Sequence, residues 1–216
     1  MIQTTELPAK ATQQQAKVME NYYTFHARIY DATRWTFLFG HQWILDWLPH
    51  GRTEKLTIME IGCGTGHNLK YLSKKYPKAT LIGWDVSKNM LKIADEKLLE
   101  IPNKLILKNL PYGTEGASYK ADVILFSYCL TMVNPHWKDL ILRAKEDLKE
   151  GGTIAVVDFH DSRFPLFKRW MNQNHVRMDS HLLPFLREHF EPKKVEIKRA
   201  YGGLWEYVLF TGKTKI

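Results

Sequence analysis

The chain has little cysteine and no long apolar run. Its 216 residues include two cysteines, Cys63 and Cys129, too few for a disulfide framework or an all-cysteine zinc site. No stretch approaches the roughly 18 consecutive apolar residues of a membrane-spanning helix. The first residues also lack the basic stretch followed by an apolar one that predicts a signal peptide. We therefore expect a cytoplasmic protein in reducing surroundings.

Internal repeats, low-complexity tracts and linkers rich in proline, glycine or serine are also missing. The length suits one well-buried domain with a modest extension. A hydrophobic content of 44% with 25% charged residues excludes a disordered or fibrous protein. The net charge is +8, of which residues 160–216 contribute +5 through 11 Lys and Arg against 6 Asp and Glu. Such a surface either attracts anionic lipid, nucleic acid or acidic substrates, or serves only solubility.

Residues 13–48 predict one or two helices that are unusually rich in aromatic side chains. Apolar side chains recur at spacings of three and four between Val18 and Ile29, which places them on one helical face. We expect residues 1–50 to form an N-terminal helical lid or substrate segment, ahead of the main domain at 51–216.

From residue 51 onwards, short apolar runs alternate with helical patterns. Strands are predicted at 56–61, 80–84, 105–107, 122–127, 153–158, 195–200 and 204–211. Helices are predicted to follow the turn at 62–66 and to cover 88–100, 134–149, 165–172 and 180–190, with Ser87 as an N-cap and a stop at Gly151-Gly152. This alternation predicts an α/β protein with a mostly parallel, seven-stranded sheet covered on both faces. The two final strands in succession predict an antiparallel edge.

The turn after the first strand carries glycine at every second position, Gly62, Gly64 and Gly66, and Glu60 stands two residues before the first of them. Glycine permits close approach of a ligand to the backbone, and the following helix offers free amide N–H groups. Asp85 follows at the end of the second strand, 23 residues beyond Gly62. That spacing suits a carboxylate that accepts hydrogen bonds from ribose hydroxyls.

The spacing of these glycines separates two nucleotide-binding families. A dinucleotide-binding turn carries its third glycine at position 67, where this chain has His67. The acidic residue followed by alternating glycines instead resembles motif I of the class I S-adenosylmethionine-dependent methyltransferases. The resemblance implies a Rossmann-like, doubly wound fold, S-adenosyl-L-methionine as the cofactor and S-adenosyl-L-homocysteine as the product.

The same resemblance implies a role for each residue of the cofactor site. Glu60 is expected to hold the amino group of the cofactor and Asp85 its ribose. Trp84 or Val86 is expected to line the adenine. Asn109, where the family often has Asp, is expected to accept a hydrogen bond from the adenine amine. The full set of cofactor-binding candidates is Glu60, Gly62, Cys63, Gly64, Gly66, Asp85, Val86, Asn109 and Ser127.

Two acceptor classes lack their motifs. After the fourth strand the chain reads Ser127-Tyr128-Cys129 rather than the Asp/Asn-Pro-Pro-Tyr/Phe motif of nucleobase methyltransferases, so a nucleic-acid acceptor is not expected. The acidic set of magnesium-dependent O-methyltransferases is not evident, and the histidines show no metal-ligand spacing, so no metal is expected.

The stretches 22–35 and 37–40 resemble the N-terminal segment of bacterial betaine-lipid N-methyltransferases, which methylate the amino group of diacylglycerylhomoserine. Three further stretches carry the same resemblance: 126–132, 157–161 and 203–207. The resemblance implies an amine acceptor on a lipid head group or on a similar small molecule.

An amine acceptor sets chemical requirements. The first methylation needs a neutral amine, so a base or desolvation must remove its proton. As methyl groups accumulate, a cage of aromatic rings stabilises the methylated ammonium by cation–π attraction. The candidates for this aromatic cage are Tyr22, Tyr30, Tyr128 and Trp205. Arg28 or Arg34 is a candidate clamp for a carboxylate. The catalytic candidates are His26, Tyr30, Asp31, Tyr128 and His160.

Other functions remain open from the sequence. One is methylation of a hydroxyl or carboxyl group of a small metabolite, and another is a non-catalytic cofactor-binding or RNA-binding module. The aromatic N-terminal helix and the basic last quarter also predict peripheral contact with an anionic membrane, at its inner face.

Overall fold

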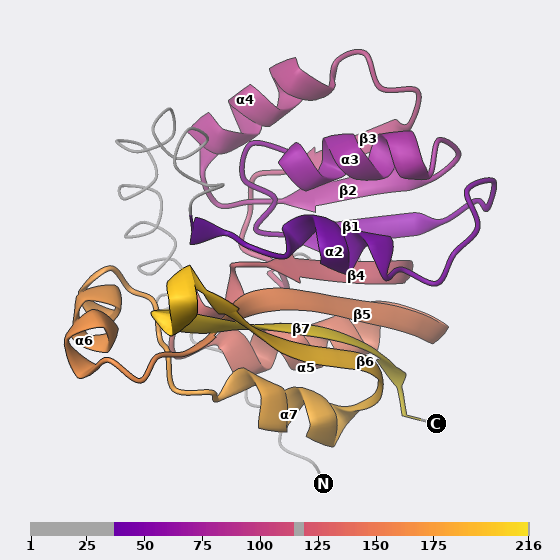
Figure 1. The fold of residues 1–216 in the computed structure, drawn as a ribbon. Helices are drawn as coiled ribbons and strands as arrows, with labels where there is room; N and C mark the ends of the chain where they lie inside the picture. The colour runs from indigo at the N-terminus through magenta and orange to yellow at the C-terminus, as the bar shows by residue number, and fades with distance from the viewer. Residues whose placement is uncertain (1–36, 115–118, 216) are drawn as a thin grey trace, which may run out of the picture.

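The computed structural model describes residues 37–114 and 119–215, which form an α/β fold around one seven-stranded sheet (Figure 1). The strand order is β3-β2-β1-β4-β5-β7-β6. The strands are β1 (Thr57–Ile61), β2 (Thr80–Trp84), β3 (Lys104–Lys108), β4 (Ala121–Ser127), β5 (Leu148–Asp161), β6 (Phe190–Ala200) and β7 (Trp205–Thr214). Strands β1 to β5 pair in parallel, whereas β7 runs antiparallel to both β5 and β6. The expected Rossmann-like sheet with an antiparallel edge is confirmed.

Helices cover both faces of the sheet. They are α2 (His41–Asp46), α3 (His67–Lys75), α4 (Lys88–Leu98), α5 (Trp137–Asp147), α6 (Pro165–Gln173) and α7 (Leu182–His189), with short 3₁₀ turns at Leu130–Met132 and Tyr201–Gly203. Helices α2, α3 and α4 pack on one face, and α5 and α7 pack on the other (Figure 1). The predicted N-cap of α4 is confirmed, because the Ser87 hydroxyl accepts a hydrogen bond from the Met90 amide at 3.3 Å.

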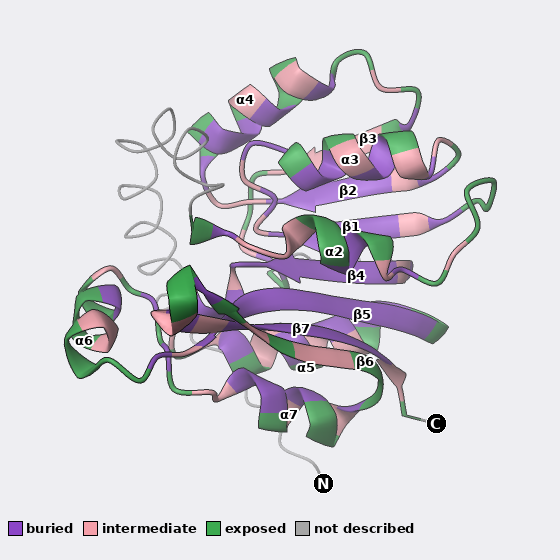
Figure 2. Ribbon diagram, in the orientation of Figure 1, coloured by how far each residue is buried: buried purple, intermediate pink, exposed green. Residues whose placement is uncertain are grey.

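The central strands are mostly apolar because both of their faces are buried (Figure 2). Successive side chains of a strand point to opposite faces. In β4, Val123 and Leu125 therefore join the core under α3 and α4, whereas Ile124 and Phe126 join the core under α5 and α7. All four side chains are completely buried.

The expected helix at 134–149 is shorter than the sequence predicts. It ends at Asp147, and β5 begins at the next residue. Gly151 does not end the helix. It takes a left-handed φ of 68° inside β5, where the pairing with β4 shifts register. The glycine pair thus marks an irregularity of the strand, and the predicted helix stop at this position is wrong.

Most of the expected N-terminal lid lies outside the described residues. Within the described part, α2 packs against β5, β7 and α3, and its Ile44 and Leu45 are fully buried. The domain boundary at residue 50 stays a prediction. In the described ranges, no helix is long and apolar enough to cross a membrane.

Candidate cofactor and acceptor site

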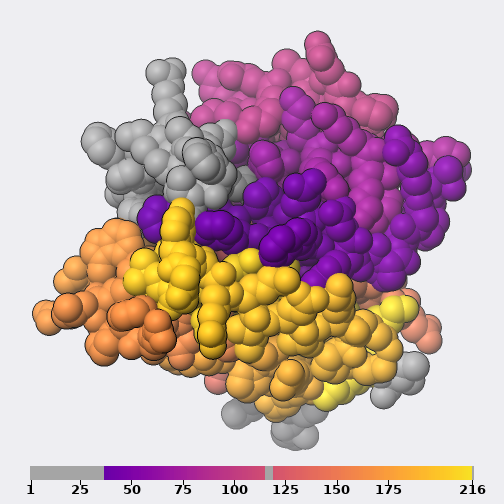
Figure 3. All heavy atoms as spheres, in the orientation of Figure 1, coloured from indigo at the N-terminus to yellow at the C-terminus, as the bar shows by residue number. Residues whose placement is uncertain are grey.

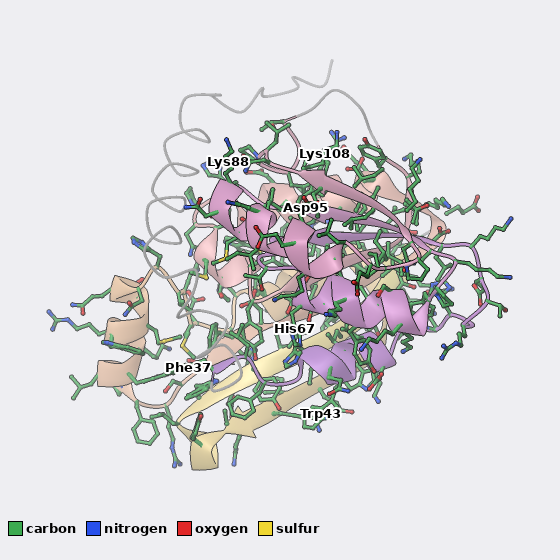
Figure 4. The ribbon with its side chains drawn as sticks, turned by 90° about the horizontal axis from the view of Figure 1, so that it is seen from above. Phe37, Trp43, His67, Lys88, Asp95 and Lys108 are labelled. Carbon is green, nitrogen blue, oxygen red and sulfur yellow. The ribbon has the colours of Figure 1, made fainter. Side chains whose placement is uncertain are left out.

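The glycine turn lies between β1 and α3 and is tied to the end of β2. The amides of Gly62 and Cys63 both donate to the Trp84 carbonyl oxygen, at 2.8 and 2.9 Å. Gly62, Gly64 and Gly66 have φ values of 73°, 53° and 73°, in the region that favours glycine. Helices α3 and α4 both begin at this edge, at His67 and Lys88 (Figure 4).

Packing leaves no room for a Cβ at Gly62 or at Gly66. A Cβ on Gly62 would lie 2.8 Å from Cys129 Sγ, and one on Gly66 would lie 2.8 Å from Leu98 Cδ1. Both thiols beside the turn stay protonated, because burial raises the pKa of Cys63 and of Cys129. The turn therefore presents backbone rather than reactive side chains.

Asp85 is fixed by hydrogen bonds to both of its carboxylate oxygens. The Gly64 amide donates to Oδ2 at 2.8 Å, and the Ser87 amide donates to Oδ1 at 2.9 Å. Burial raises the pKa of Asp85, and these two amides together with that of Val86 oppose the rise. Since each carboxylate oxygen has two lone pairs, the side chain retains acceptor capacity for the hydroxyls of a ribose.

Two further polar residues flank the turn. Glu60 is buried. Its Oε1 accepts a hydrogen bond of 2.7 Å from the side-chain Nδ2 of Asn68, in the first turn of α3. Sequence reasoning missed Asn68, although a polar side chain that soon follows a glycine turn is a usable signal.

Asn109 follows β3 and holds the loop after β2. Its Nδ2 donates to the carbonyl oxygens of Asp85 and Val86, at 3.2 and 3.0 Å. The amide oxygen is thereby left as an acceptor at the same edge. Val86 is partly exposed, whereas Trp84 is buried and packs edge-on against Tyr112 at 5.5 Å. Of the two adenine-lining candidates, Val86 is the more accessible.

The loop after β4 carries Ser127 and Tyr128. The Tyr128 hydroxyl donates to the Phe39 carbonyl oxygen at 2.7 Å, and its ring packs edge-on against Phe159. Burial raises the pKa of Tyr128. Its φ of 54° is unusual for a residue with a side chain and is held by a hydrogen bond from its amide to the Val157 carbonyl oxygen.

Asp158, at the carboxyl end of β5, organises this same loop and was given no role from the sequence. Its carboxylate is fully buried and accepts hydrogen bonds from the amides of Leu130, Thr131 and Phe159 and from the Thr131 hydroxyl. Burial raises the pKa of Asp158 to about 6. An acidic residue at the end of an otherwise apolar strand is the signal that marks it.

His160 and Trp205 lie at the same end of the sheet. Burial lowers the pKa of His160, so its ring is neutral at pH 7. The Trp205 indole stacks on Phe37 at 5.6 Å and on Phe167 at 5.5 Å. Trp205 and Tyr128, the described members of the expected aromatic cage, are thus packed among other aromatic rings.

Four buried polar atoms without a hydrogen-bond partner among the described residues lie at this edge of the sheet. They are Trp84 Nε1 at the end of β2, Ser127 Oγ at the end of β4, His160 Nδ1 near the end of β5 and Trp205 Nε1 at the start of β7. Buried polar groups are normally paired. Other such atoms lie elsewhere, for example Asn103 Oδ1 and Thr153 Oγ1, but these four lie at the edge that holds the glycine turn, where open α/β sheets bind ligands.

Neither a metal-binding cluster nor the catalytic candidates of the N-terminal segment are found among the described residues. Within residues 37–114 and 119–215, no group of three or more His, Cys, Asp or Glu side chains is placed to hold a metal ion. His26, Tyr30 and Asp31, the candidates from the N-terminal segment, lie outside the described residues.

A family model described as "Methyltransferase domain" matches residues 59–154. The match contains the glycine turn, Asp85, Asn109 and the loop after β4. The chain carries an S-adenosyl-L-methionine-dependent methyltransferase domain.

Relatives and solved structures agree with this domain. The chain is 33% identical over 149 residues to malonyl-[acyl-carrier protein] O-methyltransferase of Priestia megaterium, covering 68% of this chain and 53% of the relative. It is 33% identical over 105 residues to trans-aconitate 2-methyltransferase of Afipia carboxidovorans, covering 49% and 39%. The chain thus spans about half or less of these relatives.

Among solved structures, the fold resembles 1,6-didemethyltoxoflavin-N1-methyltransferase of Burkholderia thailandensis, whose structure holds S-adenosylhomocysteine. The TM-score is 0.73 at 14% identity, with 98% of this chain and 94% of that chain covered. This likeness supports the fold of the methyltransferase domain.

The residues at the carboxyl edge fit S-adenosyl-L-methionine. When bound, this cofactor supplies a methyl group carried on a positively charged sulfonium. The glycine turn offers backbone that a ligand can approach closely, and Asp85, Glu60 and Asn109 offer acceptor oxygens around it. The unpartnered Ser127 hydroxyl adds a donor from the end of β4.

Proposed function

We propose that this methyltransferase domain transfers methyl groups to an amine, carried by a lipid head group or by a similar small molecule. The observation that carries the proposal is His160, a buried, neutral histidine close to the end of β5. An ammonium group has no lone pair for attack on the methyl group, so an amine acceptor requires a proton acceptor nearby. A carboxylate acceptor is already ionised at pH 7 and requires none.

The cofactor roles follow the contacts at the carboxyl edge. Asp85 binds the ribose hydroxyls, Glu60 the amino group and Asn109 the adenine amine, while the backbone at 62–66 passes beneath the methionine portion. Gly64 supports the ribose site directly, since its amide orients Asp85. In-line displacement at the methyl carbon then depends mainly on how these residues position the two reactants.

His160 is the proposed proton acceptor among the described residues, with His26 and Asp31 as further candidates in the N-terminal segment. Tyr128 is proposed to position the site rather than to exchange a proton. Its hydroxyl is bonded to the Phe39 carbonyl, and burial keeps it protonated. It thereby connects the loop after β4 to the segment before α2. Tyr30 remains a candidate for stabilising the methylated ammonium.

A second candidate function is methylation of a carboxyl group. It is favoured by the names of two relatives, a malonyl-[acyl-carrier protein] O-methyltransferase and a trans-aconitate 2-methyltransferase. The likeness to methyltransferases favours both enzyme readings over a non-catalytic module.

A panel of acceptors separates the two enzymes. The purified chain is incubated with S-adenosyl-L-methionine and either diacylglycerylhomoserine in detergent, homoserine, trans-aconitate or malonyl-acyl-carrier protein, and products are identified by mass. We expect N-methylated products from an amine. Methyl esters alone would establish the second candidate and contradict the first.

A lipid acceptor also requires the enzyme to reach a membrane surface. We propose peripheral contact with anionic membranes, supported by the excess of positive charge over residues 160–216. The aromatic N-terminal segment, whose composition also favours this contact, lies outside the described residues.

A further inference from the structure

Helix α6 lies beyond the carboxyl ends of the parallel strands, at the end of the molecule that holds the cofactor site (Figure 1). It follows β5 after a short turn, so His160 and α6 are separated by only a few residues. In the space-filling view, α6 stands at one end of the molecule beside the turn between β6 and β7 (Figure 3).

One side of α6 anchors it to the domain. Met171 is buried in the core under α3 and α4, and Phe167 stacks on the Trp205 ring at 5.5 Å with an interplanar angle of 11°. Lys168 adds an ion pair of 2.7 Å to Asp161 at the end of β5. The helix is therefore held in a definite orientation.

A neighbouring side of α6 presents large apolar side chains to solvent, and its Trp170 ring lies 5.8 Å from the Phe167 ring. Leu166 is 83% exposed and Trp170 48% exposed, and their spacing of four places them on one face of the helix. Phe164, the residue before the helix, is 40% exposed. We call Phe164, Leu166 and Trp170 the α6 face. Single exposed apolar residues are ordinary, but three on one short segment form a patch of the kind that marks an interaction surface.

Positive charge surrounds the α6 face. Arg163 and Arg169 are exposed and make no ion pair with any described residue, and the Arg163 guanidinium lies 5.0 Å from the centre of the Phe164 ring. Residues 163–175 contain no Asp or Glu. A tryptophan and a leucine flanked by arginines match the interface of an anionic bilayer, where rings enter the head-group region and guanidinium groups meet lipid phosphates.

We propose that the α6 face docks on the surface of an anionic lipid bilayer. This inference rests on the proposed function and deepens it. Docking would bring the carboxyl edge of the sheet to the level of the head groups, where a lipid acceptor carries its amine. The charge complementarity of Arg163 and Arg169 selects an anionic bilayer over a zwitterionic one.

Vesicle co-sedimentation tests the docking. The full chain is mixed, without cofactor, with vesicles of phosphatidylglycerol and phosphatidylcholine or of phosphatidylcholine alone, at low and high salt. We expect pelleting with the anionic vesicles that falls as salt rises. For the variant Phe164→Ser/Leu166→Ser/Trp170→Ser, we expect the partition coefficient onto anionic vesicles to fall about tenfold or more. Arg163→Gln/Arg169→Gln is also expected to lose about tenfold or more.

The chain offers matched controls away from α6. Trp43 is as exposed as Trp170, at 48%, and Leu99 is 74% exposed, so Trp43→Ser/Leu99→Ser removes similar side chains from other surfaces. Arg52→Gln/Lys55→Gln removes two charges from the loop before β1. Both controls are expected to pellet like the unchanged chain, and thermal unfolding checks that every variant folds.

Each contrary result has a definite meaning. Absent pelleting of the unchanged chain, or equal pelleting of the α6 variant, overturns the docking. A dimer that the α6 variant converts to a monomer, without vesicle binding, also overturns it and assigns the face to self-association. Methylation of homoserine or another water-soluble amine is measured separately, because it requires no bilayer. Absence of N-methylated product both from this amine and from diacylglycerylhomoserine in detergent contradicts the proposed function, whereas N-methylated product without vesicle binding contradicts the docking and the peripheral membrane contact.

Discussion

The Gly64 amide donates a hydrogen bond of 2.8 Å to Oδ2 of Asp85. Two sequence motifs that lie 21 residues apart thereby become one structural unit. The glycine turn orients the carboxylate, and the carboxylate in turn stabilises the left-handed conformation of the turn. Cofactor binding should therefore depend on both residues together.

Replacing Asp85 by Asn is expected to weaken binding of S-adenosyl-L-methionine by about tenfold to a hundredfold, because hydrogen bonds to a charged acceptor contribute about 1.5–3 kcal/mol each. Isothermal titration calorimetry measures the effect. Asp95→Asn, on the exposed side of α4 (Figure 4), is the matched control and should bind normally. Unchanged affinity in Asp85→Asn would remove the ribose assignment.

Replacing Gly62 by Ala is expected to destabilise the fold and weaken cofactor binding. Left-handed backbone costs a residue with a Cβ about 1–2 kcal/mol. The new Cβ would also lie 2.8 Å from Cys129 Sγ, which adds about 1–3 kcal/mol of overpacking. Gly202→Ala is the control, because its φ of 65° carries the same strain but no atom lies within 4 Å. Urea unfolding should show a larger loss for Gly62→Ala, and equal losses would contradict the packing argument.

Asp158 should make stability fall as pH rises. Its pKa is raised from 3.8 to about 6 in the folded protein, so the folded state binds more protons than the unfolded state between these values. The associated stability is fully present below about pH 4 and is lost by about pH 6, on the order of 3 kcal/mol. Urea unfolding across this range, compared with Asp158→Asn, measures it. The same slope in the variant would assign the effect to other groups.

His160 should produce an acid limit to catalysis on an amine. Because burial lowers its pKa below 6.5, the ring becomes protonated, and unable to accept a proton, only in more acidic solution. We expect kcat/KM to fall on the acid side and His160→Gln to lower kcat by about a hundredfold. Affinity for S-adenosyl-L-methionine should be kept in that variant. An unchanged pH profile would exclude His160 as the proton acceptor.

Patterns within short stretches determined much of this protein before any tertiary contact was known. The left-handed glycines of the turn and the Ser87 cap depend on local backbone geometry, so short sequence patterns are enough to predict them. The run of apolar strands separated by helical patterns likewise predicts a sheet covered on both faces, as Val123 and Ile124 show by facing opposite cores.

Tertiary structure alone decided the rest, because it depends on partners far away in the chain. Gly151 lies inside β5, at the register shift between the Ala121–Leu148 and Val123–Thr153 pairs, because β4 pairs with β5 on either side of it. Asp158 fixes the loop after β4 because its carboxylate accepts hydrogen bonds from the amides of Leu130 and Thr131, which are 28 and 27 residues away. Helix α6 leaves Trp170 exposed because Phe167 and Met171 face the domain instead. Phe167 packs there on Trp205, which is distant in the sequence. Burial, charge and exposure of this kind arise only when distant segments meet.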